Sequence, residues 1–221
     1  IGVANARNIA IAESHGSIIY FLDDDCYLND SHHLRQLMHM HQSMPRVTVI
    51  GGIYKSEPQA KLSDKVFNAT VEIWSLKSQK TKIHLIHGGN LSLKKDLIGN
   101  TRFNSNLKNG GEETDFLRRL QLKGHLVFSH PTLNVVHSPY KSFFQVWKKA
   151  YNHGCEKQRQ QQQQAFTRDS LSFLNQWPFS LKVLLIIYAV FDQLGVTVES
   201  IKQILKNLYQ TEKVQKGNAS I

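Results

Sequence analysis

Three adjacent carboxylates, Asp23, Asp24 and Asp25, directly follow an apolar run at residues 17–22. The β-branched and aromatic residues of that run predict a buried strand. Adjacent carboxylates repel one another, and ligands of open α/β sheets bind beyond the carboxyl ends of strands. A hard divalent cation would offset the repulsion and could bridge the carboxylates to a diphosphate. The alternative is a solvated acidic turn that caps the next helix.

A second acidic group lies at a predicted helix start. Gly110 and Gly111 precede Glu112, Glu113 and Asp115. Acidic residues in a first turn complement the helix dipole, which is ordinary helix design and needs no catalytic role. A carboxylate at a glycine-flanked helix start can also project into a cleft and act as a general base. The residues alone leave both interpretations open.

The histidines indicate a ligand-binding role less strongly than the carboxylates do. His137 ends a strand-like segment, where a lone histidine is more often structural than a ligand. His32, His33, His39 and His41 lack the i, i+4 spacing that places two ligands on one helical face, so we interpret them as a solvated helix face. The sequence contains no P-loop, no G-x-G-x-x-G and no G-x-S-x-G motif.

The elements that must position these residues alternate between helix and strand. Hydrophobic periodicity predicts helices and short apolar runs predict strands. The expected helices cover residues 4–15, residues 31–44 with Ser31 as the cap and Pro45 as the stop, and residues 112–123 ended by Gly124. The expected strands cover residues 17–22, 47–53, 83–86 and 126–129. This alternation indicates an α/β sandwich.

Composition narrows the class of protein. The 221 residues carry a net charge of +10, and the segment 141–221 is the more basic part. Such a segment could meet nucleic acid, an anionic membrane surface or a phosphorylated ligand. The two cysteines, Cys26 and Cys155, are too few and too far apart for a disulfide scaffold and indicate a reducing compartment. No run of 18 uncharged apolar residues occurs, so no transmembrane helix is expected.

In their order along the chain, these motifs resemble the family 2 glycosyltransferases of the GT-A fold. Residues 2–8 (GVANARN) before residues 21–25 (FLDDD) resemble the family's "ARN" helix and the following strand that ends in a D-x-D motif. Residues 88–92 (GGNLS) resemble its glycine–asparagine segment near the acceptor. Residues 111–124 resemble its "GEDxD…RL…G" helix, and His137 occupies the position of a downstream metal-binding histidine. The resemblance covers roughly residues 2–154.

The resemblance implies a GT-A-like mixed sheet flanked by helices. We expect a partial glycosyltransferase domain over residues 1–140 and a helical, basic and aromatic extension over residues 141–221. The family's first strand, its "P-x-Y/F-N" segment and its base-reading acidic residue are not found. From the size of a βαβ unit, we expect about 60 or more residues to precede Ile1 in a complete domain. We therefore expect an N-terminally truncated GT-A-like domain. Whether such a fragment is active alone is left open.

The implied reaction transfers a sugar from a nucleotide-diphosphate sugar to an acceptor hydroxyl with inversion, with Mn²⁺ or Mg²⁺ stabilising the leaving diphosphate. Glu113 would be the base. The family usually has Asp at this position, so Glu112 is the fallback. The remaining site residues form three groups: metal ligands Asp25, Asp23 and His137; donor-binding Arg7, Asp23 and Asp24; and acceptor-side Gly89, Asn90 and Asp115. An alternative for Arg7 is a surface arginine of its helix.

The acceptor implied is a carbohydrate or a lipid-linked sugar, in polysaccharide or glycolipid synthesis. Aromatic and basic residues interleave at 143–151, which suits an interfacial helix, so we expect a cytoplasmic protein that is peripheral on the inner face of the cell membrane. These aromatic and apolar residues could instead cover the catalytic core.

Two other functions compete with sugar transfer. One is a metal-dependent phosphoryl-transfer or nuclease-like enzyme. The other is a non-catalytic basic nucleic-acid-binding module, although the acidic run at 23–25 argues against a continuous basic groove.

Overall fold

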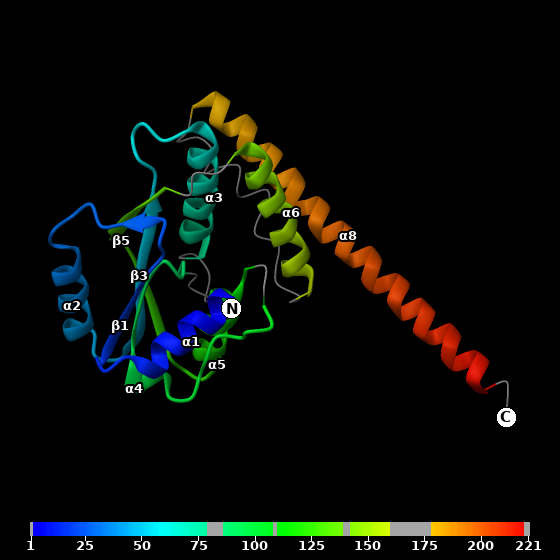
Figure 1. Ribbon diagram of the computed structural model, residues 1–221, viewed down its shortest axis with the longest axis horizontal. Helices are drawn as coiled ribbons and strands as arrows, with labels where there is room; N and C mark the ends of the chain where they lie inside the picture. Colours follow the sequence, from blue (N-terminus) through cyan, green and yellow to red (C-terminus); the bar gives the residue numbers. More distant parts are fainter. Residues whose placement is uncertain (1, 79–85, 108–109, 139–141, 160–177, 219–221) are drawn as a thin grey trace.

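A computed structural model describes residues 2–78, 86–107, 110–138, 142–159 and 178–218 of the chain (Figure 1). Its centre is a five-stranded sheet in the order β1-β4-β3-β5-β2. The strands are β1 (Ile18–Leu22), β2 (Cys26–Tyr27), β3 (Val47–Lys55), β4 (Asn90–Lys94) and β5 (Leu126–His137).

The strand directions bring several chain segments to one end of the sheet. β3 and β5 run parallel, whereas β4 is antiparallel to both β1 and β3, and β2 is antiparallel to β5. The carboxyl ends of β1, β3 and β5 therefore lie at the same end as the starts of β4 and β2. The three aspartates at 23–25 join β1 to β2 at this end, and His137 closes β5 there.

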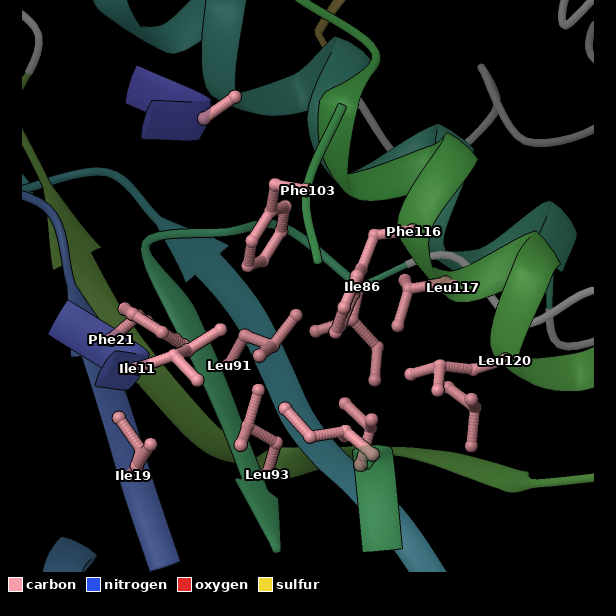
Figure 2. Close-up of a cluster of buried hydrophobic side chains, with 14 residues drawn as sticks. Ile11, Ile19, Phe21, Ile86, Leu91, Leu93, Phe103, Phe116, Leu117 and Leu120 are labelled. Carbon is pink, nitrogen blue, oxygen red and sulfur yellow. The ribbon is translucent and has the colours of Figure 1, made fainter. Parts of the chain in front are cut away.

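The alternation of side chains along each strand gives the sheet two apolar faces. Ile19 and Phe21 of β1 point toward α1 (Val3–Glu13) and α5 (Glu112–Leu122), where a buried cluster includes Ile11 and Phe116 (Figure 2). Tyr20, between them in sequence, belongs to the cluster on the other face. That face packs on α2 (His33–Ser43).

The remaining helices form a second layer beside the end of the sheet. α3 (Leu62–Ser78), α6 (Phe143–Arg159) and α8 (Phe179–Asn218) share a buried cluster with Tyr54 of β3 and Val135 of β5. α6 and α8 lie side by side, and α8 extends beyond the body of the molecule (Figure 1). The inward side of the C-terminal segment therefore packs on the body. A single helical turn, α4 (Lys95–Ile98), follows β4.

Most expected elements are confirmed to within a few residues. The strand expected at 126–129 continues to His137, and β4 was missed because its residues were assigned to a ligand-binding segment. Of the strand expected at 83–86, residues 83–85 lie outside the described residues and Ile86 is not in a strand. Ser31 does not cap α2. Instead, the side chain of Asp30 accepts a hydrogen bond from the amide of His32 at 2.8 Å.

The interpretation of the four histidines as a solvated face holds for His32 and His39, which are exposed, and is wrong for His33 and His41. His33 and His41 are 1% and 2% exposed. His33 Nε2 lies 3.2 Å from the hydroxyl of Tyr20, and His41 Nε2 lies 2.8 Å from the hydroxyl of Ser92. These partners on the sheet satisfy polar atoms that would otherwise be costly to bury.

The expectation that no helix could span a membrane also needs correction. Within α8, the stretch Phe179–Lys206 is long enough to cross a bilayer, and an 18-residue window of it is apolar enough, with a mean hydropathy of 1.8. About a third of that window, 33%, is buried inside the molecule. A single stretch of this kind is weak evidence, because core helices of soluble proteins share these properties.

Candidate active site

Arg7 is buried among three carboxylates that come from distant parts of the chain. Its neighbours on one face of α1 are Ala4 and Ile11, so the helix turns Arg7 inward, and the residue is only 6% exposed. Nη2 lies 3.1 Å from Asp23 Oδ1, and Nη1 lies 3.1 Å from Glu112 Oε1. The Oε1 atom of Glu113 lies 3.8 Å from Nη1. The alternative of a surface arginine is therefore excluded.

Two glycines let the backbone approach this cluster closely. A Cβ on Gly88 would overlap the Arg7 guanidinium, and a Cβ on Gly89 would overlap the Asp23 carboxylate. The Gly88 amide donates to Glu113 Oε1 at 3.4 Å. The Gly89 amide donates to the Tyr54 hydroxyl at 3.0 Å, which in turn donates to Asp23 Oδ2 at 3.4 Å. The structure thus brings Gly89 beside Asp23.

The start of α5 depends on backbone conformations that favour glycine. Gly110 and Gly111 have φ angles of 103° and 86°, in the left-handed region where a Cβ is strained. Gly111 is the N-cap of α5. This turn places Glu112 and Glu113 in the first turn of the helix, both facing Arg7, with the Glu112 side chain 8% exposed and that of Glu113 23% exposed.

Burial and neighbouring charges shift the pKa values of Arg7, Glu112 and Glu113 in different ways. Burial opposes the charge of Arg7, but the negative charges of Glu113, Asp23 and Glu112 outweigh it, and the pKa of Arg7 is raised. Burial and the charge of Glu113 raise the pKa of Glu112 to about 7. Burial also opposes the charge of Glu113, but Arg7 and the nearby amide groups prevail and lower its pKa. Glu113 therefore loses its proton more readily than Glu112, which keeps its proton to a higher pH than an exposed glutamate does.

A separate group at the same end of the sheet has the geometry of a metal site. Donor atoms of Asp25, Cys26 and His137 all lie within 4.8 Å of one another, and Asp25 Oδ2 is 3.4 Å from His137 Nε2. The pairing of Cys26 with His137 across β2 and β5 creates this proximity. Burial and the neighbouring Asp25 and Asp23 raise the pKa of the Cys26 thiol to about 12. The carboxylate oxygen of Asp25 is the kind of donor that Mn²⁺ and Mg²⁺ prefer, and the imidazole nitrogen of His137 can complete the set.

Asn68 holds the ring of His137 in place. Its Oδ1 atom lies 2.5 Å from His137 Nδ1, and its Nδ2 atom donates to the His137 carbonyl at 2.8 Å. Tyr54 stacks on the other side, with the ring centroids 4.4 Å apart. Nε2 is thereby left facing Asp25. Neither Asn68 nor Tyr54 was predicted. The local signal for Asn68 was a single amide that follows Val66 and Phe67 and precedes Ala69.

Several expected site residues lie outside the group formed by Asp25, Cys26 and His137. Asp23 faces Arg7 and Tyr54 and does not belong to the group formed by Asp25 and His137. Asp24 is exposed. Asp115 binds Arg119 one turn along α5, at 2.6 Å. The Asn90 side chain is held inside the sheet, where Nδ2 donates to the Leu133 carbonyl at 2.8 Å, so it cannot reach an acceptor from this position.

The fold and site define a class of protein: a GT-A-type domain with acidic and histidine side chains gathered at the carboxyl ends of its strands. Residues 2–99 match the family model "Glycosyl transferase family 2", so the resemblance inferred from the motifs is confirmed. No curated protein sequence matches the chain.

Two solved structures are similar to this chain. The mannosyltransferase PcManGT from Pyrobaculum calidifontis, in complex with GDP-Man and Mn²⁺, is 14% identical with a TM-score of 0.52 and covers 96% of this chain. This chain spans 63% of that mannosyltransferase. Glucosyl-3-phosphoglycerate synthase from Mycobacterium tuberculosis is 12% identical over 74% of this chain and 57% of its own, with a TM-score of 0.47. The first of these confirms the expected GT-A-like mixed sheet with C-terminal helices.

Proposed function

We propose that this chain forms part of a metal-dependent glycosyltransferase that transfers a sugar from a nucleotide-diphosphate donor to an acceptor hydroxyl. The observation that carries the proposal is that the Asp25–His137 pair and the carboxylates around Arg7 lie at one end of the sheet. Arg7, Asp23 and Asp25 fall within the segment that matches the family model, and Glu112, Glu113 and His137 follow it in the chain. The fold neighbour PcManGT, described as bound to GDP-Man and Mn²⁺, supports a nucleotide sugar and a divalent cation.

Asp25 and His137 would hold Mn²⁺ or Mg²⁺. When bound, the cation would supply positive charge to stabilise the leaving diphosphate. Asn68 would act as a positioning residue, since a ligand histidine needs its other ring nitrogen held by a hydrogen bond. Asp23, whose side chain is 36% exposed, would contact the ribose of the donor.

Glu113 would take the proton from the acceptor hydroxyl. Its carboxylate is ionised because Arg7 and the Gly88 amide stabilise the charge, so it can accept a proton without first losing one. Glu112 remains the fallback base, because its pKa of about 7 lies near the operating pH. A single displacement by the acceptor, with a base and no enzyme nucleophile, inverts the anomeric configuration.

Arg7 would be a positioning residue. Three carboxylates already surround its guanidinium, so it holds Asp23, Glu112 and Glu113 in place. A diphosphate could bind Arg7 only by displacing one of them. The acceptor would be a carbohydrate or a lipid-linked sugar, consistent with polysaccharide or glycolipid synthesis.

The test is release of nucleoside diphosphate from a panel of nucleotide sugars, with and without Mn²⁺, using the longest form of the protein that contains this chain. We expect metal-dependent release from one donor. Glu113→Gln should lower the rate by about 10²- to 10⁴-fold while donor binding stays nearly intact, because only proton removal is lost. Asp25→Asn should weaken the metal-dependent part of donor affinity.

The matched control is Asp96→Asn, which neutralises an exposed carboxylate on α4. It should leave both rate and affinity unchanged. Full activity of Glu113→Gln would remove the base assignment from this residue. Cleavage of a phosphodiester without any acceptor sugar would instead support the phosphoryl-transfer alternative and overturn the proposal.

A further inference from the structure

One side of α8 carries an apolar stripe that faces away from the body and is interrupted by the exposed Thr197. We define this outward stripe by six residues, each between 40% and 61% exposed: Val183, Ile186, Val190, Leu194, Ile201 and Ile204. Their spacings of three, four and seven residues place them on one helical face. At 1.5 Å per residue the stripe is about 30 Å long.

Within the stretch Phe179–Lys206, the acidic residues of α8 lie on its buried side. Asp192 and Glu199 are the acidic residues of the stretch Phe179–Lys206, and both are buried, at 4% and 8% exposed. At about 100° per residue they fall opposite the outward stripe. Glu199 is bound there by Arg159 of α6, at 2.9 and 3.1 Å. Between Phe179 and Lys206 the outward side therefore carries no acidic residue.

Lysines border the outward stripe. At the same helical angle, Lys182 and Lys202 fall on opposite sides of it, and the Lys202 side chain is 60% exposed. An apolar stripe between lysines matches the hydrocarbon boundary and the anionic headgroups of a membrane surface. Two copies of the chain joined through this stripe would bring lysines together, with no acidic residue of the stretch Phe179–Lys206 to pair with them.

We propose that the outward stripe of α8 rests in the surface of an anionic membrane, with the helix parallel to the membrane plane. Among the described residues, the rest of the molecule lies to one side of α8, and these leave the stripe open toward a flat surface (Figure 1). Anionic lipids are a property of the cytoplasmic leaflet. The donor and metal sites would then be held beside a membrane in which a lipid-linked acceptor could lie.

The packing of α8 on α6 argues for lying on the membrane rather than crossing it. A Cβ on Gly154 would overlap the Asp192 carbonyl, and a Cβ on Gly195 would overlap the Tyr151 carbonyl, so the two backbones are in close contact. α6 carries Glu156 and Arg159 beside α8. For α8 to enter the hydrocarbon core, either this contact must break or the charges of α6 must enter with it, and both are costly.

The experiment is co-sedimentation with vesicles of phosphatidylcholine alone and of phosphatidylcholine with 30% phosphatidylserine, where the percentage is roughly that of an anionic leaflet. We expect binding to the anionic vesicles that weakens with salt. The double variant Val190→Asp/Ile201→Asp should lower vesicle affinity by about tenfold or more, since both aspartates would have to enter the apolar boundary. The matched control Leu122→Asp changes a 76% exposed leucine on α5 and should bind like the wild type.

Circular dichroism of each variant checks that the fold is retained, and the readout needs no sugar transfer, so it is independent of the proposed function. Equal vesicle binding by the folded double variant and the wild type would overturn the proposal, as would no binding at low salt. A dimer in analytical ultracentrifugation that the double variant abolishes, with no vesicle binding, would assign the stripe to a second copy. Resistance to extraction from membranes by alkaline carbonate would show a crossing helix instead.

Discussion

Arg7 and Glu112 form a buried ion pair although 105 residues separate them in the chain. Arg7 Nη1 lies 3.1 Å from Glu112 Oε1, and the two side chains are 7% and 8% exposed. The pair fastens α1 to the start of α5, and the same guanidinium reaches Asp23 at the end of β1. Because both charges are removed from water, each depends on the other for compensation.

We expect Arg7→Gln to destabilise the protein by about 3–5 kcal/mol, because removing one partner leaves buried carboxylates without their counter-charge. The measurement is the free energy of unfolding from urea titrations followed by circular dichroism. Arg118→Gln, at an exposed position of α5, is the control and should stay within about 0.5 kcal/mol of the wild type. Equal effects of the two substitutions would show that the buried cluster contributes nothing specific.

The second prediction concerns the pH dependence of stability. The pKa of Glu112 is raised from 4.5 to about 7, so the folded chain binds this proton more tightly than the unfolded chain does. The resulting stabilisation is complete below about pH 4.5 and is lost as the pH rises toward 7. The pKa of Glu113 is lowered from 4.5, so Glu113 stabilises the folded chain above that pH. This contribution is lost as the pH falls below 4.5, outside the range in which Glu112 titrates.

We therefore expect the free energy of unfolding to change less between pH 4.5 and 7 in Glu112→Gln than in the wild type. Urea titrations at half-unit pH steps measure this slope. Glu13→Gln, at an exposed carboxylate at the end of α1, is the control substitution. A slope as steep in Glu112→Gln as in the wild type would mean that another group titrates in this range.

A third prediction tests the close approach of the backbone at residue 88. A Cβ in Gly88→Ala would overlap the Arg7 guanidinium, which three carboxylates hold and which cannot turn away freely. We expect a loss of about 1–3 kcal/mol, typical of overpacking. Differential scanning calorimetry of Gly88→Ala and of the control Gly2→Ala, which has open space around it, makes the comparison. A wild-type melting temperature for Gly88→Ala would show that Arg7 has room to move.

The fourth prediction concerns Asn68, which is 3% exposed and binds His137 through both its side-chain atoms. Asn68→Ala should weaken Mn²⁺ binding by about 10- to 100-fold, the usual effect of losing a hydrogen bond to a ligand histidine. Electron paramagnetic resonance of free Mn²⁺ measures the affinity without any turnover.

Two further variants separate positioning from general damage. Asn68→Asp keeps an oxygen acceptor for His137 Nδ1 and should recover part of the affinity. Asn106→Ala changes an exposed asparagine and should have no effect. If Asn68→Ala bound Mn²⁺ as tightly as the wild type, Asn68 would have no role toward the metal.

Local patterns were sufficient to predict some of the elements that hold the site. The apolar run at 17–22 and the glycine-flanked acidic start at 112 correspond to β1 and α5, because strand and helix periodicity are properties of neighbouring residues. β4 was missed although its residues alternate, since Gly88–Asn90 also fits a ligand-binding segment. The buried histidines of α2 were missed because burial depends on the opposing sheet.

By itself, the sequence determined which chemical groups this end of the sheet would hold: adjacent carboxylates, an acidic helix start, an arginine and a histidine. Only the tertiary structure decided their partners. Asp25 faces His137 because β2 and β5 pair in that register, while Asp23, two residues earlier, faces Arg7 of α1. Such pairings join residues more than 100 positions apart, and they follow from how separate elements pack, which no local pattern encodes.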